Sequence, residues 1–269
     1  MSHSQGDEMS FWDHLEELRW TLFRSIIALL VLTVGGFFVM PYLFDNIIMK
    51  PCFSDFYTYQ WLCKITSLFP FLPDFCDQRF HIDIVNIKLA TQFFTHMSTS
   101  FWLAVLLTFP YLVYEVWLFI SPALYPNEKK SVKGVFVLGT GMFFCGCAVG
   151  YLLVFPATLR FLATYELSEA ILQQVSLESY MDNFLMMIFI MGIVFEMPLV
   201  SWLLSQIGIL KRSFFRRYRR YAVVGLLLAA AIITPSGDPF TLAIVFFPLY
   251  GLYELSAYFV KKDPPEEDD

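Results

Sequence analysis

The chain has 269 residues, of which 57% are hydrophobic, 19% are aromatic and only 16% are charged, and its formal net charge is -6. A charged share this far below the usual share of about 25%, together with a mean hydropathy of +0.59, excludes a single water-soluble core and predicts a helical membrane protein. The net charge decides little, because the topology of a membrane protein follows the placement of Lys and Arg.

The N-terminal stretch MSHSQGDEMSFWDHLEELRW is polar and acidic ahead of the first apolar run. It lacks the basic start and the small-residue cleavage site of a secretory signal peptide, so we expect the first apolar segment to remain in the protein. Residues 1–9 are predicted to be disordered. From Ser10, with Asp13 three positions later in a capping-box arrangement, an amphipathic interfacial helix is predicted to lead into the membrane.

Four apolar runs approach or exceed the ~20 residues that a helix needs to cross a bilayer, and two shorter runs come near the C-terminus. The shorter pair, separated by the turn-rich TPSGDP, fits either two short spans or one re-entrant hairpin. Both alternatives return the chain to the same side. In a single membrane domain at 10–260, the expected helices cover about 20–40, 101–120, 132–154, 184–204, 221–233 and 240–259.

The basic residues are distributed unevenly over this arrangement. With a cytoplasmic N-terminus, thirteen of the eighteen Lys and Arg residues fall on the inner side, including the cluster KRSFFRRYRR at 211–220. The positive-inside rule therefore predicts that both termini are cytoplasmic. The cluster is interpreted as a topology determinant or a lipid contact rather than a nucleic-acid site, because it follows a membrane helix. The charged, Pro-rich tail at 261–269 is predicted to be disordered.

The largest polar connection is the outer loop at 41–100, which contains Cys52, Cys63 and Cys76. On an oxidising outer side we expect one disulfide among the three, and the sequence leaves its pairing open. The chain contains no nucleotide, metal or nucleophile motif, and its four histidines are scattered, so no cofactor, metal site or catalytic residue is predicted.

Acidic residues at membrane level are the remaining candidates for function. Glu17 lies near the start of the first helix and Glu128 lies in the first inner loop. Each has an ordinary alternative: a solvated helix face for Glu17 and a helix-start acid for Glu128. Glu196 stands inside the apolar run IFIMGIVFEMPLV, where a charge without a partner is costly. Pro198 would free a backbone carbonyl that helps to solvate it, whereas a protonated Glu196 with a purely structural role is the alternative.

Five motifs occur in order along the chain: HLEELR at 14–19, FPYLVYEVWLFISPALYPNEKK at 109–130, VFPATLRFL at 154–162, FEMP at 195–198 and TPSGDPF at 234–240. Together they resemble the TatC family, the signal-peptide receptor of the twin-arginine protein translocase. The resemblance implies an all-α polytopic membrane protein with six transmembrane helices in a curved, cup-like arrangement, whose last two helices are short and thin the bilayer locally. It also implies a non-enzymatic protein in the cytoplasmic membrane of a prokaryote.

The resemblance assigns signal-peptide recognition to two acids at the cytoplasmic surface. It implies that Glu17 and Glu128 bind the paired arginines, and that Arg19 orients Glu17 or its helix. Carboxylates suit this task, because a guanidinium presents a planar fork of donors that a lysine lacks.

The resemblance assigns partner binding or transport to the FEMP motif and to the outer turn. In the outer turn Leu242 departs from the family pattern, which often has Gln at this position. The implied partners are Arg-Arg signal peptides of folded proteins, single-span proteins of the TatA and TatB type, membrane lipids and further copies of the chain, without nucleic acid. The residues implied for this later step are Glu196, Pro198, Thr234, Pro235 and Asp238.

The alternative function is an ion-coupled secondary transporter in which Glu196, together with Glu115 or Glu254, carries protons near the midplane. Such transporters usually contain internal repeats, and the two halves of this chain show none. The leading prediction is therefore the translocase receptor, which uses the proton-motive force.

Overall fold

The computed structural model describes residues 11–66, 80–120, 132–165, 167–168, 173–206, 208–234 and 237–260. Within these ranges the fold is built almost entirely from helices. The long or membrane-level helices are α1 (Phe11–Leu43), α3 (Thr91–Ile120), α4 (Val132–Val149), α6 (Leu177–Val194), α7 (Met197–Gln206), α9 (Arg219–Ile233) and α10 (Pro239–Phe259). The shorter elements are α2 (Tyr57–Thr66), α5 (Phe155–Thr164), α8 (Arg212–Arg217), β1 (Ile84–Val85) and β2 (Val175–Ser176).

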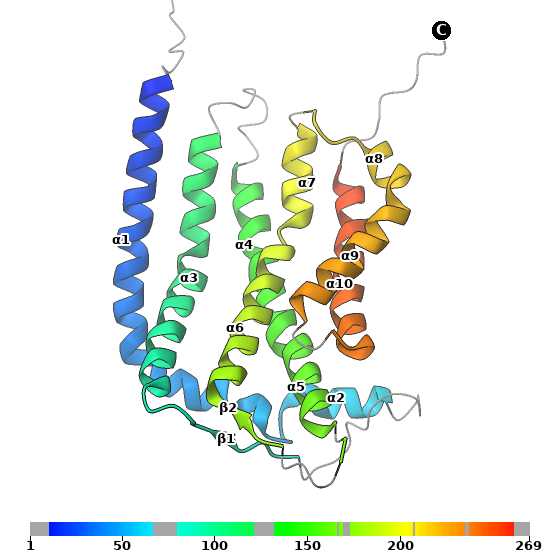
Figure 1. Cartoon of the computed structure of the whole chain (residues 1–269). Helices are drawn as coiled ribbons and strands as arrows, with labels where there is room; N and C mark the ends of the chain where they lie inside the picture. The colour runs from blue at the N-terminus through cyan, green and yellow to red at the C-terminus, as the bar shows by residue number, and fades with distance from the viewer. Residues whose placement is uncertain are drawn as a thin grey trace, which may run out of the picture.

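The helices stand side by side and run from one end of the molecule to the other (Figure 1). α1 lies at one edge and packs on α3, α4 contacts α6 in the middle, and α9 and α10 form the other edge. The start of α1, the end of α3, the start of α4, helix α8 and the end of α10 share one end of the molecule, which we call the α8 end. The opposite end contains α2, β1 and β2 and is called the cap.

Among the described residues, five stretches are long and apolar enough to cross a membrane: Leu15–Cys52, Thr91–Val116, Phe136–Thr164, Leu177–Gln206 and Pro239–Phe259. The chain is therefore a multi-pass membrane protein. α9 coincides with the span predicted at 221–233, but its 15 residues rise only about 22 Å, less than the ~30 Å of a hydrocarbon core. α10 has 21 residues, so only one of the last two helices is short.

The ends of several helices differ from the predicted ranges. The outer loop expected at 41–100 is shorter, because α1 continues to Leu43 and α3 already starts at Thr91. The span expected at 132–154 continues through a π-helical turn into α5 and ends at Thr164. The predicted disordered ends, 1–9 and 261–269, lie outside the described residues.

The helix expected at 184–204 is interrupted. α6 ends at Val194 and α7 begins at Met197. Pro198 explains the interruption, because it has no N–H to donate to the carbonyl of Val194 and its ring crowds the preceding turn. Glu196 consequently lies in a short break between two helices rather than inside one helix.

α4 and α6 cross at short range because glycines line their contact. A Cβ atom added to Gly146 would lie 2.5 Å from the carbonyl oxygen of Met191, and one added to Gly150 would lie 2.9 Å from a Cα atom of α6. From the other side, a Cβ on Gly192 would lie 2.7 Å from Sγ of Cys147. Only glycine permits this approach, which provides van der Waals contact where lipid supplies no hydrophobic force between helices.

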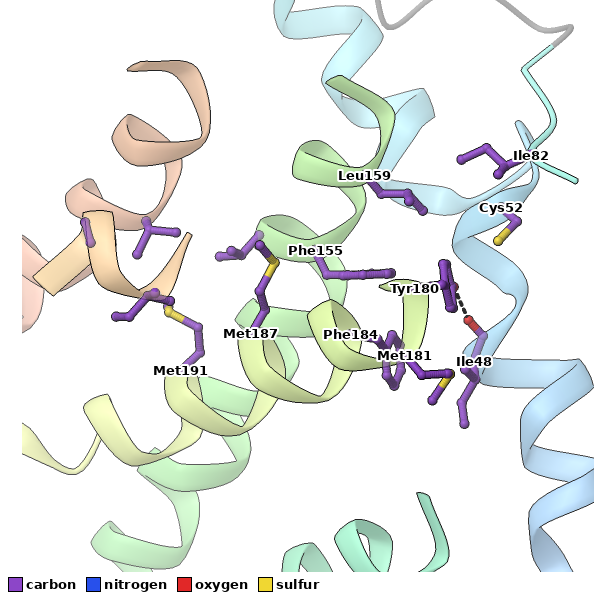
Figure 2. Close-up of a cluster of buried hydrophobic side chains, with 14 of the residues drawn as sticks. Ile48, Cys52, Ile82, Phe155, Leu159, Tyr180, Met181, Phe184, Met187 and Met191 are labelled. Atoms are coloured by element: carbon purple, nitrogen blue, oxygen red, sulfur yellow. Dashed lines mark hydrogen bonds between the residues drawn. The ribbon is translucent and has the colours of Figure 1, made fainter. Parts of the chain in front are cut away.

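A buried cluster joins the cap to α5 and α6 (Figure 2). The ring of Phe155 lies edge-on to Tyr180 and Phe184, with ring centroids 5.3 and 5.0 Å apart. The Tyr180 hydroxyl donates a hydrogen bond to the carbonyl oxygen of Ile48, which follows α1. The end of α1 is thus held against the start of α6 by both packing and a buried hydrogen bond.

Arg160 of α5 packs against aromatic rings of the cap. Its buried guanidinium carbon lies 4.9 Å from the ring centroid of Tyr59 and 4.7 Å from that of Phe80, a cation–π arrangement that is strongest when it is desolvated. The Tyr59 hydroxyl donates to the carbonyl oxygen of Pro51 at 2.6 Å, and burial raises the pKa of this phenol.

The cap also contains a short parallel strand pair and a disulfide. β1 and β2 pair with Ile84 opposite Val175. Cys63 in α2 is disulfide-bonded, whereas Cys52 is a free, buried thiol. Cys76 lies outside the described residues.

The glycine contact can be tested with Gly146→Ala. The added methyl group would overlap the α6 backbone, so we expect a loss of about 1–3 kcal/mol of stability, measured as a lower melting temperature in detergent. Gly141→Ala is the matched control, because nothing lies within 4 Å of a Cβ at this position on the same helix. An equal loss in both variants would contradict the close crossing.

Candidate functional site

Glu17 lies in the second turn of α1, at the α8 end. It is half-buried, and among the described residues it makes no hydrogen bond or ion pair. Arg19, expected to orient Glu17, instead pairs with Glu16 at 3.3 Å, and both side chains are exposed. An exposed pair of this kind contributes little to stability. Within the described ranges, the Glu17 carboxylate therefore has no cationic partner.

Two turns further along α1, Arg24 forms an ion pair with Glu115 of α3. Its Nη2 lies 3.0 Å from Oε2 of Glu115, whose residue is only 3% exposed. Tyr111 donates its hydroxyl to the other carboxylate oxygen. Thr21, which is also buried, lies 3.4 Å from the guanidinium. The buried carboxylate is thus satisfied from both helices.

A second arginine–carboxylate pair joins α9 to α10. Nε of Arg219 donates to Oε1 of Glu254 at 2.7 Å. Glu115 and Glu254, either of which the transporter alternative adds to Glu196 as a proton carrier, are therefore each engaged by an arginine. Glu196 differs from both in this respect.

Glu196 occupies the break between α6 and α7, in the middle of the bundle. Its Oε1 atom is buried and has no hydrogen-bond partner among the described residues. Gly139 of α4 faces the carboxyl group: a Cβ there would lie at ordinary contact distance, 3.6 Å, from Oε2 of Glu196, but would crowd the side chain of Leu199 at 2.8 Å. A buried polar atom without a partner is unfavourable, so this position is suited to receive a polar group from another molecule.

Asp238 has a clear local role as the N-cap of α10. Its carboxylate accepts hydrogen bonds from the N–H groups of Phe240 at 3.0 Å and Thr241 at 2.8 Å. The signal was present in the sequence, because Asp followed by Pro ahead of an apolar run is typical of a helix start. Thr234, at the end of α9, is buried, and its hydroxyl has no hydrogen-bond partner among the described residues.

The predicted residues do not form one site. Glu17 lies at the α8 end, Glu196 lies in the middle, and Asp238 begins α10 on the side toward the cap (Figure 1). Glu128 and Pro235 lie outside the described residues. Within the described ranges, no group of His, Cys, Asp and Glu side chains could hold a metal ion. The predicted residues that the structure describes are therefore spread over three levels of the bundle.

Comparison with known proteins shows which family the chain is similar to. The chain matches the description "TatC: Sec-independent protein translocase protein (TatC)" over residues 13–248. It is 33% identical over 256 residues to the Sec-independent protein translocase protein TatC of Blattabacterium sp. subsp. Periplaneta americana (strain BPLAN), which covers 95% of this chain and 96% of that protein. It is 32% identical to the TatC protein of Deinococcus radiodurans over 245 residues, covering 91% and 83% of the two chains.

A crystal structure of the twin-arginine translocase receptor TatC in DDM is similar to this fold with a TM-score of 0.72, at 27% identity over 92% of this chain and 99% of that one. The match confirms the predicted all-α TatC-like fold. TatC proteins are non-enzymatic components of protein transport, so the ion-coupled transporter is set aside. By the extent of all these matches, the chain belongs to the TatC family of Sec-independent protein translocase proteins.

Proposed function

We propose that this chain is the receptor subunit of a twin-arginine translocase. It binds Arg-Arg signal peptides of folded proteins at the α8 end and then assembles with single-span partners of the TatA and TatB type, and with further copies of itself, for transport driven by the proton-motive force. The observation that carries the proposal is Glu17, an acid with no partner among the described residues, at one end of a TatC-family bundle. A similar structure bears the name twin-arginine translocase receptor.

The proposed orientation places the α8 end in the cytoplasm and the cap outside. Two independent features support it. The arginines of α8 and the start of α9 gather at the α8 end, which the positive-inside rule assigns to the cytoplasm. The disulfide-bonded Cys63 belongs to the cap, and disulfides persist in oxidising compartments. In the inner membrane of a prokaryote, both termini then face the cytoplasm.

Recognition in this proposal uses two acids for two arginines. The ends of the helices that flank Glu128, at Ile120 and Val132, lie at the same end as Glu17, which supports a joint role. A carboxylate accepts two parallel N–H bonds from a guanidinium, whereas an ammonium offers only a point charge. Two such contacts account for a preference for Arg-Arg over Lys-Lys.

A later step is assigned to the middle and outer parts of the bundle. The buried, unpartnered Oε1 of Glu196 supports contact with a polar group of a partner helix, and Pro198 supports it by keeping Glu196 in a helix break. The outer turn with Thr234, Pro235 and Asp238 is proposed as a second docking region, supported by the unpartnered Thr234 hydroxyl.

Membrane lipids are the remaining proposed partners. A pocket at the α8 end, with a volume of about 450 Å³, is lined by Arg212, Arg216 and Arg219 together with Tyr253 and Tyr258. Glu254 also lines the pocket and pairs with Arg219, so head-group binding is assigned to the other two arginines, Arg212 and Arg216. Basic pockets between helices on the cytoplasmic side suit anionic head groups.

Peptide binding tests the recognition site. Glu17→Ala and Glu128→Ala should each weaken binding of a synthetic Arg-Arg signal peptide by about tenfold or more, the loss expected for a charge-assisted hydrogen bond, measured on protein in detergent. Glu16→Ala is the matched control, because it removes a neighbouring exposed acid that pairs with Arg19. If both test variants bind the peptide as tightly as the unchanged protein, the proposed site is wrong.

The role of Glu196 is tested by separating binding from transport. Glu196→Ala should reduce transport of a folded substrate into inverted membrane vesicles and leave Arg-Arg peptide affinity within about twofold, as for a substitution distant from the peptide. Glu178→Ala serves as control, since Glu178 is an acid of α6, the helix that precedes Glu196, and it pairs with Lys88 near the surface. An equal loss of peptide binding in Glu196→Ala would contradict a role in the later step.

Asp238 can be tested with two variants that separate capping from charge. Asp238→Ala should lower stability by about 1 kcal/mol, whereas Asp238→Asn retains the cap and the melting temperature. If the carboxylate also docks a partner, Asp238→Asn loses transport at normal stability. Normal transport by Asp238→Asn would leave Asp238 with the capping role alone.

A further inference from the structure

Thr21, Arg24, Tyr111 and Glu115 form a polar group, here called the α1–α3 charge cluster. The Arg24–Glu115 pair spans 91 positions of sequence and joins the edge helix α1 to its neighbour α3. The side chain of Glu115 is 5% exposed and that of Arg24 is 51% exposed, so the carboxylate is buried and the guanidinium reaches the surface. Removing the arginine would leave a buried carboxylate without its charge partner.

The cluster lies on the same face of α1 as Glu17. α1 is one uninterrupted helix from Phe11 to Leu43. Residues four and seven positions apart share a helix face, so Glu17, Thr21 and Arg24 form one row along the side of α1 that packs on α3. The axial separation from Glu17 to Arg24 is about 10 Å.

The cluster is also near the end of α3. Glu115 lies five positions before Ile120, where α3 ends and the chain continues toward Glu128. The ion pair therefore connects the helix that carries Glu17 with the helix that leads into the loop of Glu128.

We propose that the Arg24–Glu115 pair positions the recognition acid Glu17. It holds α1 at one height and one rotation relative to the end of α3, and so sets where Glu17 stands relative to the last turns of α3. This inference rests on the proposed function, because it assigns Arg24 and Glu115 as positioning residues of the same site and not as groups that touch the signal peptide.

The edge helix α1 needs a polar contact of this kind, because apolar packing alone allows a helix to shift along its neighbour. A shift of α1 by one residue moves its side chains by about 1.5 Å and rotates them by about 100°, which breaks the ion pair but exchanges one apolar contact for another. Near the cap, Nε2 of His96 lies 2.8 Å from the carbonyl oxygen of Phe37, a second polar contact between α1 and α3. The α1–α3 charge cluster fixes the end at which recognition is proposed. Recognition of a guanidinium by two oxygens tolerates an error of only about 0.5 Å.

The test compares the affinities of Arg-Arg and Lys-Lys signal peptides, because their ratio separates positioning from folding. A purely structural defect reduces the competent fraction of the protein and weakens both peptides by the same factor, which leaves the ratio unchanged. A positioning defect weakens the Arg-Arg peptide more than the Lys-Lys peptide. Glu115→Gln and Arg24→Gln should each lower the ratio by about tenfold, the size expected for residues that act through others.

The other arginine–carboxylate pair at the α8 end provides the matched control. Arg219→Gln and Glu254→Gln break the pair between α9 and α10 and should leave the ratio unchanged, even where the melting temperature falls. The double variant Arg24→Glu with Glu115→Arg restores an ion pair and should recover part of the ratio. If a cluster variant does not fold, Tyr111→Phe removes only one hydrogen bond from Glu115 and should still lower the ratio.

The outcomes separate the two proposals. An unchanged ratio in Glu115→Gln, Arg24→Gln and Tyr111→Phe, while Glu17→Ala loses the Arg-Arg peptide, overturns the positioning role and leaves the proposed function intact. If Glu17→Ala binds both peptides normally, the proposed recognition site itself fails. A reduced ratio in the Arg219 and Glu254 controls would also overturn the inference, because any ion pair at this end would then have the same effect.

Discussion

The middle of the bundle depends on how closely α4 can approach its neighbours. Gly139, Gly146 and Gly150 are seven and four positions apart, so they share one face of α4. Gly146 and Gly150 meet the backbone of α6, and Gly139 meets the carboxyl group of Glu196 in the helix break and Leu199 in α7. The same glycine face therefore holds α6 in place, lets Leu199 of α7 approach α4, and lies beside the acid. In lipid this contact area, rather than exclusion of water, keeps the helices together.

Five of the six predicted spans fall on stretches that are long and apolar enough to cross a membrane, but the apolar runs did not predict where the helices begin. α3 starts at Thr91, ten residues ahead of its predicted span. The prediction starts later because the stretch TQFFTHMSTS is polar and does not belong to the apolar run that follows it. In the structure these hydroxyls bond back to their own helix: Thr99 donates to the carbonyl of Thr95 and Ser100 to that of His96. A hydropathy count treats such groups as exposed polar atoms, whereas the helix itself satisfies them.

The candidate residues were predictable where the signal was local. Pro198 ends a helix by its own chemistry, and Asp238 ahead of Pro239 is readable as a cap. The pairing of Arg24 with Glu115 was not predictable. Each is a single charged residue in its own helix, and one sequence does not show which residues of different helices meet. The shared face of Glu17 and Arg24 follows from the helical repeat, but its direction toward α3 required the packed structure. Likewise, three outer cysteines predicted a disulfide, and only the fold identified Cys63 as a participant.

The two arginine–carboxylate pairs stand at opposite edges of the bundle, between α1 and α3 and between α9 and α10, while glycine contacts hold its middle. The ion pairs and the glycine contacts differ in how they respond to salt and to competing charged groups. Close van der Waals packing is indifferent to ions, whereas a partly exposed ion pair is weakened by salt and can exchange either member for another group of the same charge. At the edge proposed to bind the signal-peptide arginines, α1 is itself held to α3 by an arginine, Arg24. A signal-peptide arginine that binds there carries the same guanidinium group as Arg24. The contact between a guanidinium and a carboxylate would then both bind the peptide and hold α1 against α3.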